Sequence, residues 1–170
     1  MKSALKTTGM FLLSLSLLFT ISCSSDDEQA EAAYDFIDQN AQGSIEGNDF
    51  NFGSGKISDS NAENELFIKL YDDSETFTDP CDALGLGEFV NVFFSIPKEV
   101  GLYELTASFS IDEEGQTVTL FNPATFLNIV ASDGAVEILT ITAEQITGRI
   151  DARLDNDFVN GNFTAIFCSE

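Results

Sequence analysis

The sequence predicts an all-β fold, a single antiparallel domain of about nine strands that closes either as a β-sandwich or as a small β-barrel. Three observations favour this fold class. From residue 43 onward, apolar residues alternate with polar ones in one short segment after another. Segments rich in Gly, Asn and Asp separate these strands, as turns do. No stretch has the periodicity of a long amphipathic helix, and parallel strands would need crossover helices.

The first two expected strands, 44–46 and 49–52, form a hairpin around a two-residue turn at Gly47-Asn48. The segment 53–58 is rich in glycine and serine, so we expect a flexible connection there. A phosphate-binding loop is not expected, because Ile57 stands where that motif needs a Ser or a Thr.

The next strands are expected at 66–71 and 90–96, where apolar residues occupy alternate positions. Two more strands, 103–111 and 117–121, flank an acidic turn at 112–115.

The C-terminal part of the sequence predicts four further strands. The segments 126–131 and 136–142 flank Ser132-Asp133-Gly134, a turn sequence that predicts a hairpin. Both segments are apolar on both faces, so we expect them in the centre of the sheet. The last two strands, 146–154 and 159–167, alternate regularly.

The N-terminal region has the features of an export signal. Lys2 and Lys6 precede an apolar segment, 10–21, that is too short to span a membrane. Small residues and Cys23 follow it, in an arrangement that resembles the lipobox of bacterial lipoproteins. Thr20 departs from that pattern, because leucine is usual at its position.

The acidic segment 24–28 resembles the surface-export tag of lipoproteins from Bacteroidota. This resemblance implies that residues 1–22 are a signal peptide, that Cys23 carries the lipid, and that 23–42 is an acidic tether. The β-domain would then occupy residues 43–170, anchored in the outer membrane and exposed at the cell surface. The alternative is an ordinary signal peptide in which the cysteine is incidental.

The segment 134–167 resembles the hairpins of small Bacteroidota lipoproteins of unknown function. This resemblance implies a β-sandwich or calycin-like domain. It identifies no functional residue.

Charge and composition exclude several classes of partner and mechanism. Beyond residue 22 the chain has five basic and 29 acidic residues, a net charge of −24. A nucleic-acid partner would need a basic surface. An anionic bilayer would repel the domain, so we expect membrane attachment through the lipid alone. The chain has no His, which excludes Ser-His-Asp and Cys-His catalysis.

Two cysteines remain once Cys23 is assigned to the lipid. An even pair in an exported protein is typical of a disulfide, which would close a loop of 87 residues between Cys81 and Cys168. In the chain-entropy model such a loop is worth about 4–5 kcal/mol. The alternative is a pair of buried free thiols.

One acidic cluster is a candidate calcium site. Calcium takes six to eight oxygen ligands, and a long loop rich in carboxylates can supply them. A solvated acidic loop is the simpler interpretation, since no EF-hand spacing is present. The calcium hypothesis assigns the carboxylates of Asp72, Asp73, Glu75, Asp79 and Asp82. No other cofactor is expected.

Without His, Asp and Glu are the remaining acid–base candidates. Glu137 shares a strand face with apolar residues, and burial there would raise its pKa, but no partner carboxylate can be identified. Arg149, Asp151, Arg153 and Asp155 alternate on one face of one strand, which is typical of an exposed ladder of ion pairs.

We therefore expect a non-enzymatic, lipid-anchored β-domain with a binding or accessory role in the cell envelope, and a glycan or a protein as its ligand. The alternatives are a carboxylate-dependent glycoside hydrolase and a calcium-dependent binding module. Two carboxyl groups about 5–9 Å apart in a cleft would favour the hydrolase. An aromatic groove without such a pair would favour a binding module.

Overall fold

The computed structural model of the chain describes residues 34–59, 64–74, 79–82, 90–106 and 116–168. Contacts divide the chain into two compact units, Met1–Glu31 and Ala32–Glu170, and every described residue lies in the second. The expected all-β fold is confirmed, since the described residues form ten strands and one short 3-10 helix. No helix within the described ranges is long and apolar enough to cross a bilayer.

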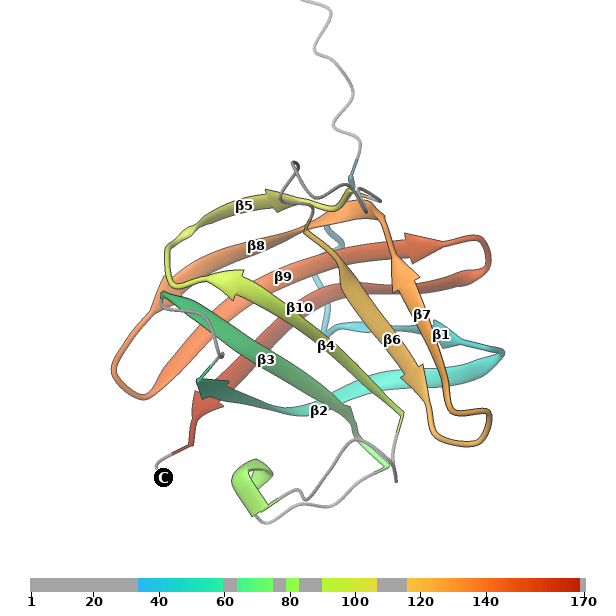
Figure 1. Ribbon diagram of the computed structural model, residues 1–170, viewed down its shortest axis with the longest axis horizontal. Coiled ribbons are helices and arrows are strands. Elements are labelled where there is room, and N and C mark those ends of the chain that lie inside the picture. Colours follow the sequence, from blue (N-terminus) through green and yellow to red (C-terminus); the bar gives the residue numbers. More distant parts are fainter. Residues whose placement is uncertain (1–33, 60–63, 75–78, 83–89, 107–115, 169–170) are drawn as a thin grey trace, which may run out of the picture. The chain divides into compact units, whose positions relative to one another are not determined.

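Figure 1 labels the elements in chain order. They are β1 (Gln42–Ile45), β2 (Asn48–Asp59), β3 (Glu65–Asp72), η1 (Pro80–Asp82), β4 (Asn91–Pro97), β5 (Gly101–Glu104), β6 (Val118–Asn122), β7 (Leu127–Ala131), β8 (Asp133–Ile141), β9 (Gln145–Leu154) and β10 (Asp157–Phe167).

Hydrogen bonds join all ten strands into one sheet, in the order β5-β8-β9-β10-β1-β2-β3-β4-β6-β7. Neighbouring strands are antiparallel, apart from a short parallel contact between the C-terminal end of β10 and β2. The sheet is not closed, because its edge strands β5 and β7 do not pair with each other. The architecture is therefore sandwich-like.

The sheet folds over into two layers. In the view of Figure 1, β8, β9 and β10 cross β3, β4 and β6. Phe94 of β4 and Phe163 of β10 meet edge to face, with ring centroids 5.9 Å apart. Apolar residues of both inner faces form one core. The opposite side of β2, β3, β4 and β6 is an outer face of the sheet.

β2 passes from one layer to the other. Its first residues pair with β1, its later residues pair with β3, and the register shifts between Phe52 and Ser54. The loop expected at 53–58 is wrong, because these residues lie within the strand. Their small size has a packing role, since a Cβ on Gly55 would lie 2.7 Å from the carbonyl oxygen of Thr164. Glycine therefore lets β2 approach β10 closely.

The hairpin expected around Ser132-Asp133-Gly134 is also wrong. β7 pairs with β6, β8 pairs with β5 and β9, and Ser132 alone separates β7 from β8. Gly134 has φ +110°, and a Cβ there would lie 1.9 Å from the carbonyl oxygen of Asp151. The glycine thus permits a bend between the layers. β7 is an edge strand rather than a central one, and its Leu127 is 54% exposed.

The hairpin that begins the domain is confirmed, with its turn one residue earlier than expected. Ile45 pairs with Asn48, so Glu46 and Gly47 form the turn. Both have positive φ, 50° and 74°, as a type I′ turn requires. β5 is shorter than the strand expected at 103–111. Leu105 forms only an isolated bridge with Gln116. Residues 107–111 lie outside the described residues, as does the expected turn at 112–115.

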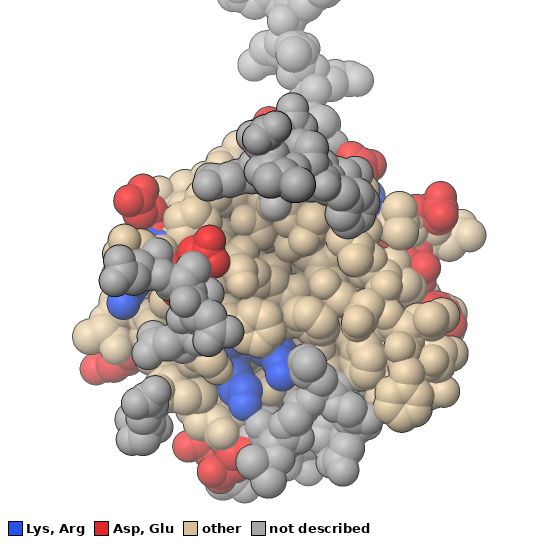
Figure 2. Space-filling view, in the orientation of Figure 1, with Lys and Arg blue, Asp and Glu red and all other residues tan. Residues whose placement is uncertain are grey.

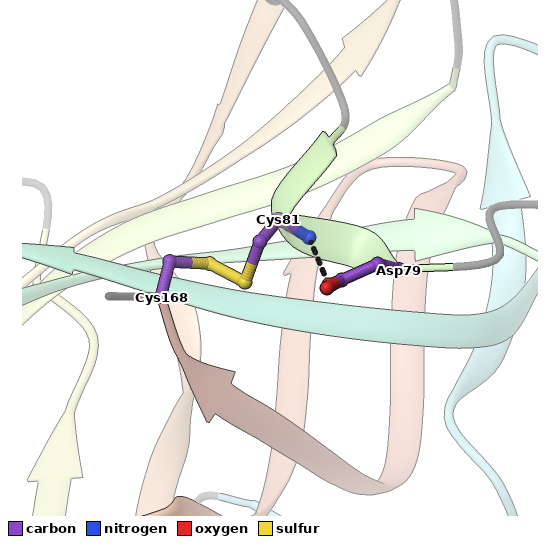
Figure 3. The surroundings of a disulfide bond; sticks show 3 residues. All are labelled: Asp79, Cys81 and Cys168. Carbon is purple, nitrogen blue, oxygen red and sulfur yellow. Dashed lines mark hydrogen bonds between the residues drawn. A yellow bond between two sulfur atoms is a disulfide. The ribbon is translucent and has the colours of Figure 1, made fainter. Parts of the chain in front are cut away.

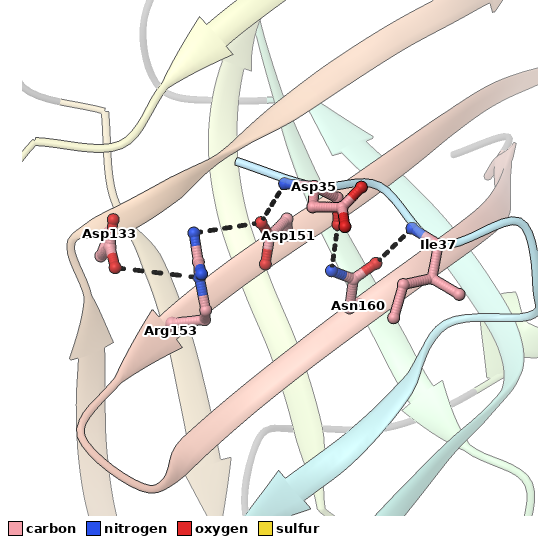
Figure 4. Close-up of polar contacts among 6 residues, drawn as sticks. All are labelled: Asp35, Ile37, Asp133, Asp151, Arg153 and Asn160. Atoms are coloured by element: carbon pink, nitrogen blue, oxygen red, sulfur yellow. Dashed lines mark hydrogen bonds and ion pairs between the residues drawn. The ribbon is translucent and has the colours of Figure 1, made fainter. Parts of the chain in front are cut away.

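The lead-in segment, residues 34–41, is fixed to the sheet without forming a helix. The backbone N–H groups of Asp35 and Ile37 donate to the side chains of Asp151 and Asn160, each at 2.9 Å. Asn160 Nδ2 donates in return to the carbonyl oxygen of Asp35 at 2.7 Å. Figure 4 shows these contacts along β9 and β10. The lead-in segment therefore adds to the β-domain ahead of β1.

Candidate functional site

The structure contains the disulfide that the sequence predicts. The sulfur atoms of Cys81 and Cys168 are bonded, and their Cα atoms lie 5.5 Å apart. Cys81 belongs to η1, where its N–H donates to Asp79 Oδ1 at 2.9 Å (Figure 3). Cys168 follows β10, and its N–H donates to the carbonyl oxygen of Ile57 at 3.3 Å. The bond therefore ties η1, between β3 and β4, to the end of the last strand.

The outer face of β3 carries an aromatic and basic cluster. The apolar residues on the inner parity of β3 belong to the core, so Phe67, Lys69 and Tyr71 share the outer face. The register places Lys69 opposite Lys56 of β2 and, on its other side, opposite Phe93 of β4. Figure 2 views this face: basic side chains gather low on it, and acidic side chains lie mainly around its margin.

A recess of about 280 Å³ opens beside this cluster, and we call it the aromatic recess. The rings of Phe67 and Phe93 contribute to its wall, tilted by 51° with centroids 5.8 Å apart. Gln116 Nε2 donates to the carbonyl oxygens of Ser95 and Thr117, which orients its side chain. The lining comprises Glu65, Phe67, Phe93, Phe94, Ser95, Gln116, Thr117 and Thr119. It combines aromatic rings, hydroxyls, one amide and one carboxylate.

Lys69 is a buried cation beside Phe67, one of the residues that line this recess. The residue is 6% exposed, and its Nζ lies 5.8 Å from the ring centroid of Phe67 and 5.9 Å from that of Tyr71. Among the described residues, no carboxylate forms an ion pair with it. Burial lowers the pKa of Lys69 to about 8, and the ammonium of Lys56 is a further cause.

Lys56 and Tyr71 complete the cluster. Lys56 Nζ lies 5.9 Å from the Tyr71 ring centroid, and burial lowers the pKa of this amine as well. Burial also raises the pKa of Tyr71 to about 12. Tyr71 is therefore neutral at physiological pH and supplies no negative charge to the two amines.

The acidic residues assigned to calcium are described in part. Asp72 is buried and accepts hydrogen bonds from the backbone N–H groups of Asn51 at 2.7 Å and Ser74 at 3.0 Å. Within the described ranges, no three Asp, Glu or Cys side chains lie together as metal ligands would. Glu75 lies outside those ranges. Asp73, Asp79 and Asp82 are exposed, and the calcium site stays a prediction.

The carboxylate considered as a general acid, Glu137, forms an ion pair with Nε of Arg149 on the neighbouring strand. The exposed ladder expected along β9 is wrong in one respect. Asp151 is only 1% exposed, because the lead-in segment lies over it, and it pairs with Nη2 of Arg153 at 3.2 Å. Asp155 lies in the turn that follows β9.

The sequence analysis names no residue of the outer face as a candidate binding residue. The sequence does contain an indication of this site, because Lys69 lies between two aromatic residues in a strand whose other face is apolar. The position of Lys56 could not be predicted in this way, because residues 53–58 were expected to form a loop rather than a strand. Only the β2–β3 register reveals that the two lysines are neighbours. Cys23, the expected lipidation site, lies outside the described residues.

Comparison with known proteins adds no family to this description. No family model matches the chain, and neither the curated proteins nor the solved structures gave a match.

Proposed function

We propose that this protein is a lipid-anchored binding protein of the outer membrane, exposed at the cell surface, whose ligand occupies the aromatic recess. One observation carries the proposal: the rings of Phe67 and Phe93 line a recess on an outward-facing side of the sheet, beside the buried amine of Lys69. Ligand sites typically combine apolar or aromatic surface with oriented polar groups. The recess supplies two aromatic rings, and the larger part of its lining surface is polar.

The chemistry of the lining supports binding rather than hydrolysis. A glycoside hydrolase needs two carboxyl groups in one cleft, about 5–9 Å apart. Among the described residues that line the recess, Glu65 is the only carboxylate. Glu137 lies on β8, outside that lining, and is engaged by Arg149.

The size of the recess indicates what kind of ligand would fit. A volume of about 280 Å³ lies just below the range of about 300–1,000 Å³ that is usual for small-molecule sites, so a small ligand group is expected. Flat aromatic faces beside hydroxyl and amide groups suit a ring that has an apolar face and polar edges. A sugar ring at the end of a glycan has this character, and it is the ligand class we propose.

A binding experiment tests the proposal on the full-length protein, purified from membranes in detergent. Isothermal titration with a panel of neutral and acidic oligosaccharides measures the affinity. We expect at least one to bind, and we expect Phe67→Ala and Phe93→Ala to weaken it about tenfold or more, since each removes part of the aromatic surface. Phe158→Ala is the matched control, because Phe158 is a 43% exposed phenylalanine of β10 outside the recess. Absence of binding across the panel, or binding that neither recess variant weakens, would show that the recess is not the site.

A further inference from the structure

The basic residues of this domain have different surroundings. Five remain beyond residue 22, against 29 acidic residues. Both arginines form ion pairs with carboxylates of β8 or β9, and Lys98 is exposed after β4. The other two, Lys56 and Lys69, lie directly opposite each other on neighbouring strands.

That juxtaposition is unfavourable for folding. Like charges directly opposite each other on adjacent strands destabilise a sheet, and a buried amine loses hydration. Packing of the lysine stems and ammonium groups on Tyr71 recovers part of this free energy. Among the described residues no carboxylate forms an ion pair with Lys69, so this packing leaves the charge of its buried amine without a counter-ion there. Groups held in an unfavourable electrostatic environment are concentrated at functional sites.

We propose that Lys56 and Lys69 bind an anionic group of the ligand whose ring lies in the aromatic recess, so that the protein selects acidic saccharides over neutral ones. The inference rests on the proposed function. The chemistry required is an oxyanion on a sugar ring, supplied by a carboxylate, a sulfate or a phosphate. Lys69 connects the two parts of the site, because its Nζ lies 5.8 Å from the ring centroid of Phe67, which lines the recess.

The surrounding charges define the orientation of such a ligand. Glu65 lines the same recess and is two residues before Phe67 on the same face of β3. Its carboxylate would repel an anionic group at that position. The anionic end of the ligand should therefore point toward Lys69 and its uncharged end toward Glu65. The net charge of the domain disfavours long polyanions, so the site suits a compact acidic group rather than a nucleic acid.

Anion binding would be coupled to the protonation of Lys69. A bound anion favours the ammonium form and raises its pKa from about 8. The groups facing Lys69 are Lys56 on β2, Tyr71 on β3 and the uncharged Phe93 on β4. Tyr71 stays neutral, since its pKa is about 12. Affinity for an acidic ligand should therefore fall as the pH rises from 7 to 9.5, whereas affinity for a neutral ligand should not.

The test compares matched ligands on the full-length protein in detergent. Short galactose oligomers that end in one galacturonic acid or in one galactose serve as acidic and neutral probes, with an oligomer that ends in one sulfated galactose and inorganic sulfate as further arms. We expect the acidic oligomers to bind about tenfold or more tightly than the neutral one, the difference that one charge-assisted hydrogen bond makes. Lys69→Met should abolish that advantage and Lys69→Arg should retain it. Lys98→Met, at an exposed lysine outside the recess, should change nothing.

The outcomes separate the two proposals. If acidic and neutral oligomers bind equally and Phe67→Ala weakens both, the recess binds saccharides but the inference about the lysines is wrong. If no oligomer binds, both proposals are wrong. Binding of inorganic sulfate without binding of any oligomer would lead to the same conclusion. The pH dependence of the affinity of the wild-type protein for the acidic oligomer is a second test, which requires no variant. Equal affinity for the acidic oligomer at pH 7 and pH 9.5 would also overturn the inference.

Discussion

Asp151 of β9 accepts a hydrogen bond from the backbone N–H of Asp35, 116 residues earlier in the chain, at 2.9 Å. The same carboxylate oxygen, Oδ2, lies 3.2 Å from Nη2 of Arg153 (Figure 4). Asp151 is 1% exposed, so a buried charge is balanced by one guanidinium and one backbone donor. This arrangement fixes the lead-in segment to β9, a strand that is paired on both sides.

Asp151→Asn should release the lead-in segment and lower the free energy of unfolding by about 2–4 kcal/mol, because it removes a buried charge from its guanidinium partner. Hydrogen exchange of the Asp35 and Ile37 amides measures the local effect, and urea unfolding measures the global one. Asp133→Asn is the control, since Asp133 approaches the same Arg153 at 3.8 Å but its side chain is 66% exposed. Equal effects of the two substitutions would contradict a special role for Asp151.

The bend between β7 and β8 depends on a glycine. A Cβ on Gly134 would lie 1.9 Å from a backbone carbonyl oxygen, at φ +110°. We expect Gly134→Ala to destabilise the domain by about 2–4 kcal/mol through backbone strain and overpacking. Gly47→Ala is the control: Gly47 also has positive φ, but a Cβ there meets nothing within 4 Å, so its cost should be near 1 kcal/mol. Thermal unfolding of each variant measures the loss of stability. Similar losses in the two variants would show that the structure accommodates the added Cβ at residue 134 without a large cost.

Local alternation was sufficient to predict the bounds of half of the strands. β3, β4, β6, β9 and β10 coincide closely with the apolar periodicity of the sequence. The failures at 53–58 and 132–134 share a cause. Glycine and serine signal a turn, but the same residues allow a strand to approach another closely or to bend between layers. Only the tertiary neighbours, Thr164 and Asp151, distinguish these uses.

The candidate site was less predictable than the fold. A disulfide requires only an even pair of cysteines in an exported chain, so Cys81–Cys168 could be predicted. The recess requires the register of β3 against β4, and the lysine pair requires the register of β2 against β3. Strand register depends on bulges and long-range packing, which no local pattern specifies.

The disulfide should contribute strongly to stability. Cys81 and Cys168 are 87 residues apart, so the bond constrains a long loop in the unfolded chain. We expect Cys168→Ser to lower the free energy of unfolding by about 2–5 kcal/mol. Chemical unfolding compares the stability of the oxidised wild-type protein with that of Cys168→Ser. Free thiols are quantified before and after denaturation. Two reactive thiols in protein taken from an oxidising compartment would contradict the bond.

Lipidation at Cys23 is the prediction on which the proposed location depends. We expect the wild-type protein to fractionate with membranes of a Gram-negative host and to carry a lipid-sized mass increase. Cys23→Ala should give soluble or uncleaved protein. Asp35 lies twelve positions after Cys23, so even a fully extended chain between them would span at most about 40 Å. Wild-type protein found free and unlipidated in the medium would refute the anchor.

The last prediction concerns the pH dependence of stability. The pKa of Lys69 is about 8 in the folded protein and 10.5 when unperturbed, so between these values the unfolded chain binds more protons than the folded one. Stability should therefore rise with pH through this window. The pKa of Tyr71 is about 12 rather than 10, so the folded state holds the extra proton above pH 10, and stability should fall there. We expect a maximum near pH 10.

Urea unfolding at a series of pH values measures this curve in the ligand-free protein. Between pH 7.5 and 9.5 we expect a gain of about 1–2 kcal/mol, less than the full shift of the Lys69 pKa would give, because the interval between the folded and unfolded pKa values extends beyond this range. Lys69→Met should be more stable than the wild type at pH 7.5, and its free energy of unfolding should increase much less with pH. Lys98→Met should show the same increase as the wild type, because Lys98 is exposed. A flat or falling wild-type curve over this range would mean that the amine of Lys69 is not desolvated, and the electrostatic argument for the lysine pair would fail with it.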